Sequence, residues 1–283
     1  MPLVSIVLGG RDLRLWLVWR RRLTLSESRS CAEMSTGGFT RAREGARIPG
    51  IKRELASPFG SNGLLGRRQT AAWRVMAALE VVVAAAVVIS DFFIATLIVL
   101  PLVVISLAIR RQGPSALGFR RTPRALRMIA IVFGLTLAWD LFQFGVTMPI
   151  LNRITGERQD LSQFAGLQGN LGSLLIFLAV SWTLAAVGEE IVYRGYLPLR
   201  ITDVFGANTV GILAAVVLSS VLFGLAHTEQ GPIGIILTFL DALFFSFLRW
   251  RFKNLWAAVL GHGFNNTIGL VSFYLVGPMY GLW

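Results

Sequence analysis

Long apolar runs constrain the fold of this chain more than any other feature of its sequence. From about residue 75 to the C-terminus, runs of roughly 17–25 residues recur, separated by polar or basic segments. Only 15% of the residues are charged, whereas about a quarter is typical of soluble domains. The runs are continuous, unlike the weaker alternating segments of a membrane β-barrel. We therefore expect an all-α fold, a polytopic helical membrane protein.

About seven segments are expected to span the membrane. The first two, about 75–90 and 92–109, come from one apolar stretch that is broken at Ser90-Asp91, and a single long tilted helix is the alternative. Gly231-Pro232, a breaker pair, separates two later segments. The remaining five segments are about 128–151, 171–200, 209–227, 233–249 and 255–276.

The distribution of positive charge predicts the orientation, because cytoplasmic loops are enriched in Lys and Arg. With the N-terminus in the cytoplasm and seven spans, the outside loops carry only Arg153 and Arg158. The C-terminus then lies outside, and we expect the plasma membrane as the location. The inside positions carry Arg110, Arg111, Arg120, Arg121, Arg124, Arg127, Arg194, Arg200, Arg249, Arg251 and Lys253.

The N-terminal segment, residues 1–72, is basic and rich in Gly, Ser and Arg, and we expect it to be largely disordered. An over-extended start is the alternative, with Met34 or Met76 as the first residue. Residues 73–283 would form the helical membrane domain. The net charge of +12 is explained by positive charge beside the membrane, so lipid is the expected partner and nucleic acid is not.

Two adjacent carboxylates, Glu189 and Glu190, lie at the end of an apolar run, and Arg194 follows four residues later. Charged residues within a membrane usually face a bundle interior or a wet cavity. Glu190 and Arg194 are spaced i,i+4, so we expect them to share a helix face and to pair. Glu189 points about a quarter-turn away from that pair, which leaves its carboxylate free for other chemistry.

The chain contains two histidines, and both lie in apolar segments. His227 closes the fifth segment, and Phe223, four residues earlier, is better suited to packing against it than to chemistry. His262 lies in the seventh segment and shares a helix face with Asn266. Glu189, His227 and the His262–Asn266 pair come from three segments, so only folding could bring them together.

Three aspartates also occur in or beside the apolar segments. We expect Asp91 and Asp140 to be structural, and Asp241 is the best candidate among the three for a supporting role. A carboxylate in a membrane segment is a functional hypothesis by default, but it often only fixes helix packing.

The glutamate, histidine and asparagine side chains are compatible with several kinds of site. A carboxylate beside an imidazole can deprotonate water, and His262 and Asn266 offer donors to an oxyanion, as in a hydrolase of amides or esters. Glu189, His227 and His262 could instead hold a divalent metal, although the chain has no HExxH motif and no Cys/His cluster. A transporter, or a non-catalytic membrane scaffold or immunity factor, would use the same polar groups.

Three ordered motifs, about 35 residues apart, resemble those of the CPBP intramembrane protease family. This family comprises the CAAX prenyl proteases and their bacterial relatives, including proteins linked to bacteriocin self-immunity. The resemblance covers about residues 110–270 and includes a GFRR element at 118–121. The motifs are EExxxR (Glu189, Glu190, Arg194), FxxxH (Phe223, His227) and HxxxN (His262, Asn266).

The resemblance implies an intramembrane endopeptidase that acts on a membrane-associated peptide or protein. In such an enzyme Glu189 and His227 would activate water, while His262 and Asn266 would stabilise the oxyanion. Supporting roles would fall to Glu190, Arg194 and Phe223. If a divalent metal such as zinc takes part, its ligands would be Glu189, His227 and His262. Prenylated tails, bacteriocin precursors and other membrane-anchored peptides are all compatible substrates.

Overall fold

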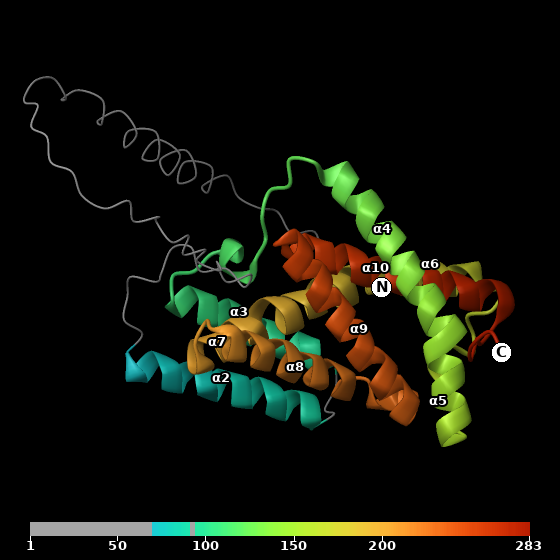
Figure 1. The fold of residues 1–283 in the computed structure, drawn as a ribbon, viewed down its shortest axis with the longest axis horizontal. Coiled ribbons are helices and arrows are strands. Elements are labelled where there is room, and N and C mark those ends of the chain that lie inside the picture. Colours follow the sequence, from blue (N-terminus) through green and yellow to red (C-terminus); the bar gives the residue numbers. More distant parts are fainter. Residues whose placement is uncertain (1–69, 91–93) are drawn as a thin grey trace, which may run out of the picture. The chain divides into compact units, whose positions relative to one another are not determined.

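The computed structural model describes residues 70–90 and 94–283, and every regular element within these ranges is helical (Figure 1). The all-α prediction is therefore confirmed. The predicted N-terminal tail, residues 1–72, lies almost entirely outside the described residues. In chain order the helices form seven continuous rods: α2 (Ala71–Ile89), α3 (Ala95–Ile109), α4–η2–α5 (Ala125–Phe142, Gln143–Thr147, Met148–Thr155), α6–η4–α7 (Leu171–Val180, Ser181–Tyr196, Leu197–Phe205), α8 (Thr209–Leu225), α9 (Gly231–Phe252) and α10 (Leu255–Val276).

The seven predicted segments correspond to these seven rods, although most of the ends differ by a few residues from the predicted ones. The structure has two helices rather than one in the first stretch, because α2 ends at Ile89 and α3 begins at Ala95. The fourth rod runs beyond the predicted end at Arg200, since Pro198 occupies the first turn of α7, where proline is tolerated. His227 lies past the end of α8, directly before the 3-10 turn η5 (Thr228–Gln230), so its predicted place within the fifth helix was wrong.

Within the described residues, four rods are long and apolar enough to cross a membrane. They are α2, Ala125–Thr155, Leu171–Phe205 and Thr228–Phe252. The helices α3 and α8 are apolar but shorter. Seven membrane spans therefore remain a prediction.

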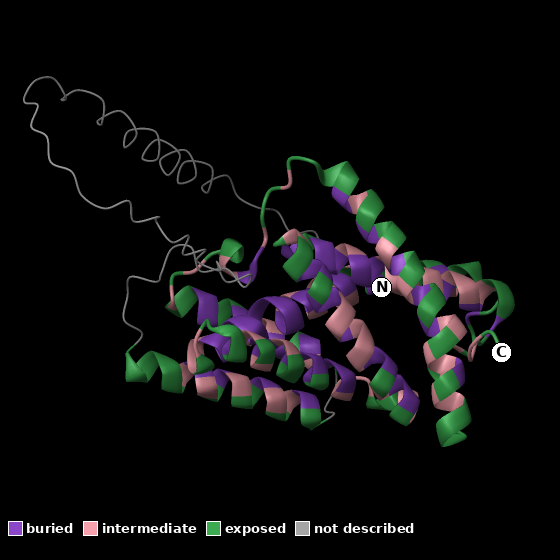
Figure 2. Ribbon diagram, viewed as in Figure 1, coloured by how far each residue is buried: buried purple, intermediate pink, exposed green. Residues whose placement is uncertain are grey.

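The helix α10 and the π-helix η4 lie at the centre of the packing. The helix α10 contacts α4, α6, η4 and α9, and η4 also contacts α3 and α8. The helices α2, α7 and α8 run side by side (Figure 1). Buried residues gather in 192–202 and in the first half of α10, whereas α2 and α8 carry many exposed residues (Figure 2). The exposed residues include large apolar ones such as Leu79 and Leu213. An exposed apolar surface of this kind suits contact with lipid.

The loop at 110–124 packs against the turn between α9 and α10. The carbonyl oxygen of Gly118 accepts a hydrogen bond from the backbone N–H of Leu255 at 2.9 Å. Gly118 has a φ of +100°, and a Cβ there would meet the guanidinium of Arg249 at 3.0 Å. Glycine is therefore required at this position for both its conformation and its lack of a side chain.

Three of the arginines counted as loop charges are buried instead. Arg194, Arg200 and Arg249 are at most 2% exposed, so their side chains interact within the protein. They therefore carry no information on how the chain is oriented in the membrane. Exposed basic residues still gather beside the α9–α10 turn, so a cytoplasmic N-terminus stays a prediction that labelling of single cysteines with an impermeant reagent would test. These residues are Arg120, Arg121, Arg124, Arg127, Arg251 and Lys253.

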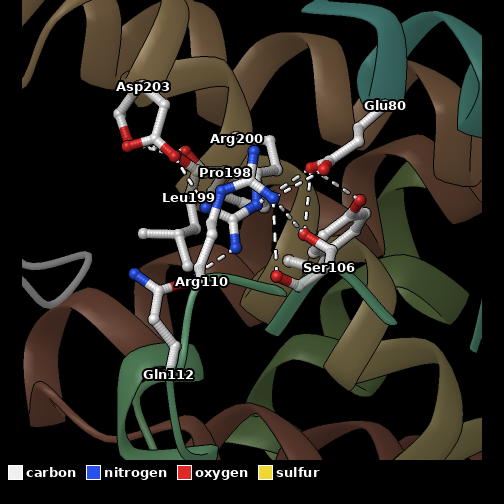
Figure 3. Close-up of polar contacts among 10 residues, drawn as sticks. Glu80, Ser106, Arg110, Gln112, Pro198, Leu199, Arg200 and Asp203 are labelled. Carbon is white, nitrogen blue, oxygen red and sulfur yellow. Dashed lines mark hydrogen bonds and ion pairs between the residues drawn. The ribbon is translucent and has the colours of Figure 1, made fainter. Parts of the chain in front are cut away.

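Glu80 of α2 is the centre of a buried polar network that sequence reasoning missed (Figure 3). Its carboxylate accepts hydrogen bonds from Arg110 at 2.6 Å and from Ser106 and Tyr196 at 3.0 Å. The Nε atom of Arg200 lies 3.2 Å from the same carboxylate. The network joins α2 to α3, η4 and α7. Glu80 is the only acid in the apolar run of α2, and that signal alone marks it as a residue with a buried partner.

Candidate active site

The two adjacent glutamates lie on a π-helix, which the sequence analysis did not predict. In η4 the backbone hydrogen bonds join residues five apart, and such segments are rare and usually only one turn long. Glu190 and Arg194 nevertheless pair as predicted, with Nη1 of the arginine 3.0 Å from Oε1 of the glutamate. Both side chains are at most 2% exposed, so the pair is an internal one.

His262 of α10 lies between the two glutamates. Its Nδ1 atom is 2.9 Å from Oε1 of Glu190, and its Nε2 atom is 3.9 Å from Oε2 of Glu189. The carboxylate of Glu190 thus contacts both His262 and Arg194, which fixes the orientation of the imidazole. Oε2 of Glu189 is buried and has no hydrogen-bond partner among the described residues. Glu189 is therefore the carboxylate that remains available to a ligand.

Phe223 connects the two histidines. Its ring centroid is 4.8 Å from that of His227 and 5.7 Å from that of His262. The guanidinium of Arg194 lies 4.1 Å from the centre of the same ring. Phe245 of α9 stacks on the ring of His262, with the two ring centroids 4.9 Å apart. Aromatic contacts thus hold both imidazoles and the Glu190–Arg194 pair in one packed unit.

The hydrogen bond of His227 determines which of its nitrogens is available. Its Nδ1 atom lies 2.8 Å from the carbonyl oxygen of Phe223, and a carbonyl can only accept. Nδ1 therefore carries the proton, and in the neutral ring Nε2 has the free lone pair. This tautomer suits a side chain that takes a proton from water.

His227, His262 and Asn266 line a single cavity of about 390 Å³. Glu189 is not part of the lining, and it approaches the cavity through His262. Other lining residues come from the loop after α5, from η5 and from the segment after α10. The structure thus brings the candidate residues from η4, α8–η5 and α10 to one place, although Glu189 lies beside His262 and forms no ion pair with His227 within the described residues.

A glycine lets η4 and α10 approach each other beside the two glutamates. A Cβ on Gly263 would meet the ring of Trp182 at 2.5–2.7 Å. The Nε1 atom of the same tryptophan donates a hydrogen bond to Oγ1 of Thr267 at 3.1 Å. The spacing of η4 and α10, and with it the reach of His262 to Glu189 and Glu190, depends on the absence of a side chain at Gly263.

The Gly263→Ala variant is therefore expected to lose about 1–3 kcal/mol of stability, because the added methyl group overpacks the contact with Trp182. Gly269→Ala is the matched control on the same helix, since a Cβ at that position meets nothing within 4 Å. Thermal unfolding in detergent micelles measures both variants. Equal midpoints for the two would contradict the close approach.

The proposed metal ligands do not form a metal site as the structure places them. Within residues 70–90 and 94–283, no group of three or more His, Cys, Asp or Glu side chains is arranged to hold a metal ion. Glu189, His227 and His262 thus do not fit the open three-ligand arrangement of a catalytic zinc.

Residues 171–268 match the protein-family model described as type II CAAX prenyl endopeptidase Rce1-like. All residues of the three motifs fall inside this match. The matched segment, residues 171–268, is therefore an Rce1-like CAAX peptidase domain. The match covers about a third of the chain, and residues 110–170 of the expected resemblance lie outside it. Neither the curated proteins nor the solved structures include a significant match.

The Rce1-like domain indicates a CAAX-type intramembrane peptidase, and the apolar rods make the chain an integral membrane protein. Part of its cavity lining, however, comes from outside the matched segment, including Asp140 near the end of α4 and Gln143 at the start of η2. Asn265 of the domain donates a hydrogen bond to Asp140. Sequence reasoning named Asp140 as structural and did not identify Asn265, although an aspartate in an apolar run was the available signal.

Proposed function

We propose that this protein is an endopeptidase that hydrolyses a peptide bond of a membrane-associated substrate within the cavity. In this proposal Glu189 and His227 activate a water molecule, and His262 and Asn266 stabilise the oxyanion. The observation that carries the proposal is the position of His262. Its ring contacts both glutamates on one side and lines the cavity with His227 and Asn266 on the other.

The reaction needs a base, an oxyanion donor and exclusion of bulk water. The water loses a proton to Glu189 or to Nε2 of His227 as its oxygen attacks the carbonyl carbon. The negative charge that develops on the carbonyl oxygen is stabilised by the amide N–H of Asn266 and by Nε2–H of His262 in its doubly protonated form, because Nδ1–H of that ring is donated to Glu190. The amine then leaves with the proton that the base received, and the products are a carboxylic acid and an amine.

Glu190 and Arg194 have a supporting part in this proposal. Because Glu190 accepts from Nδ1 of His262, it fixes the ring with Nε2 toward Glu189. Arg194 neutralises the charge of Glu190 and packs against Phe223. Preorganised groups of this kind stabilise a transition state without rearranging during the reaction.

Lining residues from the loop after α5 and from η5 suggest the side from which a substrate enters. The backbone N–H of Asp160 donates to the carbonyl oxygen of Gln230, which joins the loop after α5 to η5 at the cavity. This loop lies at the end predicted to face outside. A plasma-membrane location with entry from the outer side or from the bilayer is therefore part of the proposal.

His227→Ala tests the proposal. Because Nε2 of His227 is a proposed proton acceptor, the variant should lose at least about 100-fold in cleavage rate. Membranes that carry the wild type should contain new peptide termini that are absent with the variant, as measured by mass spectrometry of N-termini. Thr228→Ala, an exposed neighbour, is the control. Identical termini with wild type and His227→Ala would favour a scaffold or a transporter.

A further inference from the structure

The cavity has an acidic lining although the chain as a whole is strongly basic. The chain has 27 Lys and Arg residues against 15 Asp and Glu. Three carboxylates, Asp140, Asp241 and Glu229, line the cavity, and the described lining includes no Lys or Arg. Asp140 is buried and Asp241 is partly buried among the helices, whereas Glu229 is exposed in η5.

Asp140 of α4 has one partnered and one unpartnered oxygen. Oδ1 accepts a hydrogen bond from Nδ2 of Asn265 at 2.8 Å. Oδ2 is buried and has no hydrogen-bond partner among the described residues, and the residue as a whole is 4% exposed. A carboxylate oxygen in this position needs a donor, because burial without one costs free energy.

Asp241 of α9 uses the neutral donors around it. Its Oδ1 atom accepts hydrogen bonds from Nε1 of Trp139 at 2.7 Å and from Nε2 of Gln143 at 3.1 Å. The Oε1 atom of Gln143 is buried and unpartnered. The atoms left over in this cluster, Oδ2 of Asp140 and Oε1 of Gln143, are both acceptors, so the cluster calls for a ligand that donates several hydrogen bonds.

No arginine or lysine of the described chain forms an ion pair with either aspartate. Arg194 forms an ion pair with Glu190. Arg110 and Arg200 form ion pairs with Glu80. Asp140 is buried and Asp241 is partly buried, and carboxylates in such positions without an ion-paired counter-charge favour either a proton or an incoming cation. Lysine and arginine side chains supply a positive charge together with three or five N–H donors.

The aspartates lie next to the proposed catalytic groups. Asp241 and Phe245 are spaced i,i+4 on α9 and so share a face, and Phe245 stacks on His262 at 4.9 Å. Asn265, the partner of Asp140, directly precedes Asn266 on α10. The acidic cluster is thus joined to the proposed catalytic groups through Phe245 on α9 and through the adjacent residues Asn265 and Asn266 on α10.

We propose that Asp140 and Asp241 form a subsite that binds the cationic side chain of a lysine or arginine of the polypeptide substrate, next to the scissile bond. The subsite rests on the proposed peptidase function. It assigns the enzyme a preference for basic peptides and a discrimination against acidic residues at the same position.

The test compares lipid-anchored peptides that differ at one position, with lysine, norleucine or glutamate. A positional library identifies a peptide that the detergent-solubilised full-length protein cleaves, and kcat/KM is then measured for the three forms. The wild type should prefer lysine to norleucine at least 10-fold. The double variant Asp140→Asn, Asp241→Asn should lose this preference, and cleavage of the norleucine peptide should remain within about threefold of wild type.

Glu229→Gln is the matched control, because it removes an exposed acid of the same cavity and should leave the preference unchanged. Equal cleavage of the lysine and norleucine peptides by the wild type, or an unchanged preference in the double variant, overturns the subsite. If no peptide is cleaved at all, the proposed function fails separately. Binding of the peptides to the wild type then decides: tighter binding of the lysine form, lost in the double variant, supports the subsite, and equal binding overturns it.

Discussion

Replacing Glu189 with glutamine is expected to lower the cleavage rate about 10³-fold while leaving the protein folded in the membrane. Glutamine has the shape of glutamate, but it cannot accept the proton of water, and positioned acid–base groups contribute about 10²–10⁴-fold. The structure predicts little loss of stability. Glu189 has no arginine partner in the described chain, and its buried Oε2 atom makes no hydrogen bond there.

Glu190→Gln is the matched comparison, one residue along the same π-helix. This change leaves the buried guanidinium of Arg194 without its counter-charge and weakens the hydrogen bond to His262. Breaking a buried ion pair costs about 3–5 kcal/mol, so this variant should lose stability as well as activity. The cleavage rate and the unfolding midpoint in detergent separate the two cases. A Glu189→Gln variant that keeps a tenth or more of the activity would exclude Glu189 as the base.

The helical organisation could be predicted because it depends on average hydropathy. Runs of apolar residues identified all seven rods, and the break at Ser90-Asp91 separated α2 from α3. Backbone groups in lipid must be satisfied within the segment, so long apolar runs leave little choice but a helix. The same averaging hides individual charges, and this is why Glu80 and the burial of Arg249 were missed.

The candidate site could be predicted only in part. Short-range spacing identified the Glu190–Arg194 pair, and the ordered motifs indicated which segments meet. Spacing could not predict that η4 is a π-helix, because the same residues also fit an α-helical pattern. It could not predict that His262 rather than His227 lies nearest Glu189, because that depends on how α10 packs against η4.

The acidic wall of the cavity illustrates the same limit. Asp140 and Asp241 lie 101 positions apart in the sequence, and each alone resembles an ordinary polar residue in a membrane helix. Only the structure shows that the two aspartates line one cavity. There Trp139 and Gln143 donate hydrogen bonds to Asp241, and Asn265 donates one to Asp140. Long-range pairs of this kind have no local signal, whereas an ionisable residue in an apolar run does.

Replacing Glu80 with glutamine is expected to cost about 3–5 kcal/mol of stability, because it removes the counter-charge of two buried arginines. Arg200 is fully buried, and its remaining ionic partner in the described chain, Asp203 at 2.7 Å, lies on the opposite side of the guanidinium from Glu80 (Figure 3). Arg110 would lose its 2.6 Å contact. The helix α2 is then held to α3 and α7 chiefly by apolar contacts, which lipid can replace.

The unfolding midpoint in micelles measures the loss, and Glu157→Gln, an exposed loop acid, is the control that should change it by less than about 0.5 kcal/mol. A double-mutant cycle with Arg110→Gln should give a coupling energy of about 1–3 kcal/mol, since the two side chains share one ion pair. Glu80 lies outside the cavity lining, so cleavage per folded molecule should be unchanged. If Glu80→Gln leaves the unfolding midpoint unchanged, the Glu80 network does not stabilise the fold. If the variant keeps full stability but loses cleavage, the Glu80 network is coupled to the active site instead.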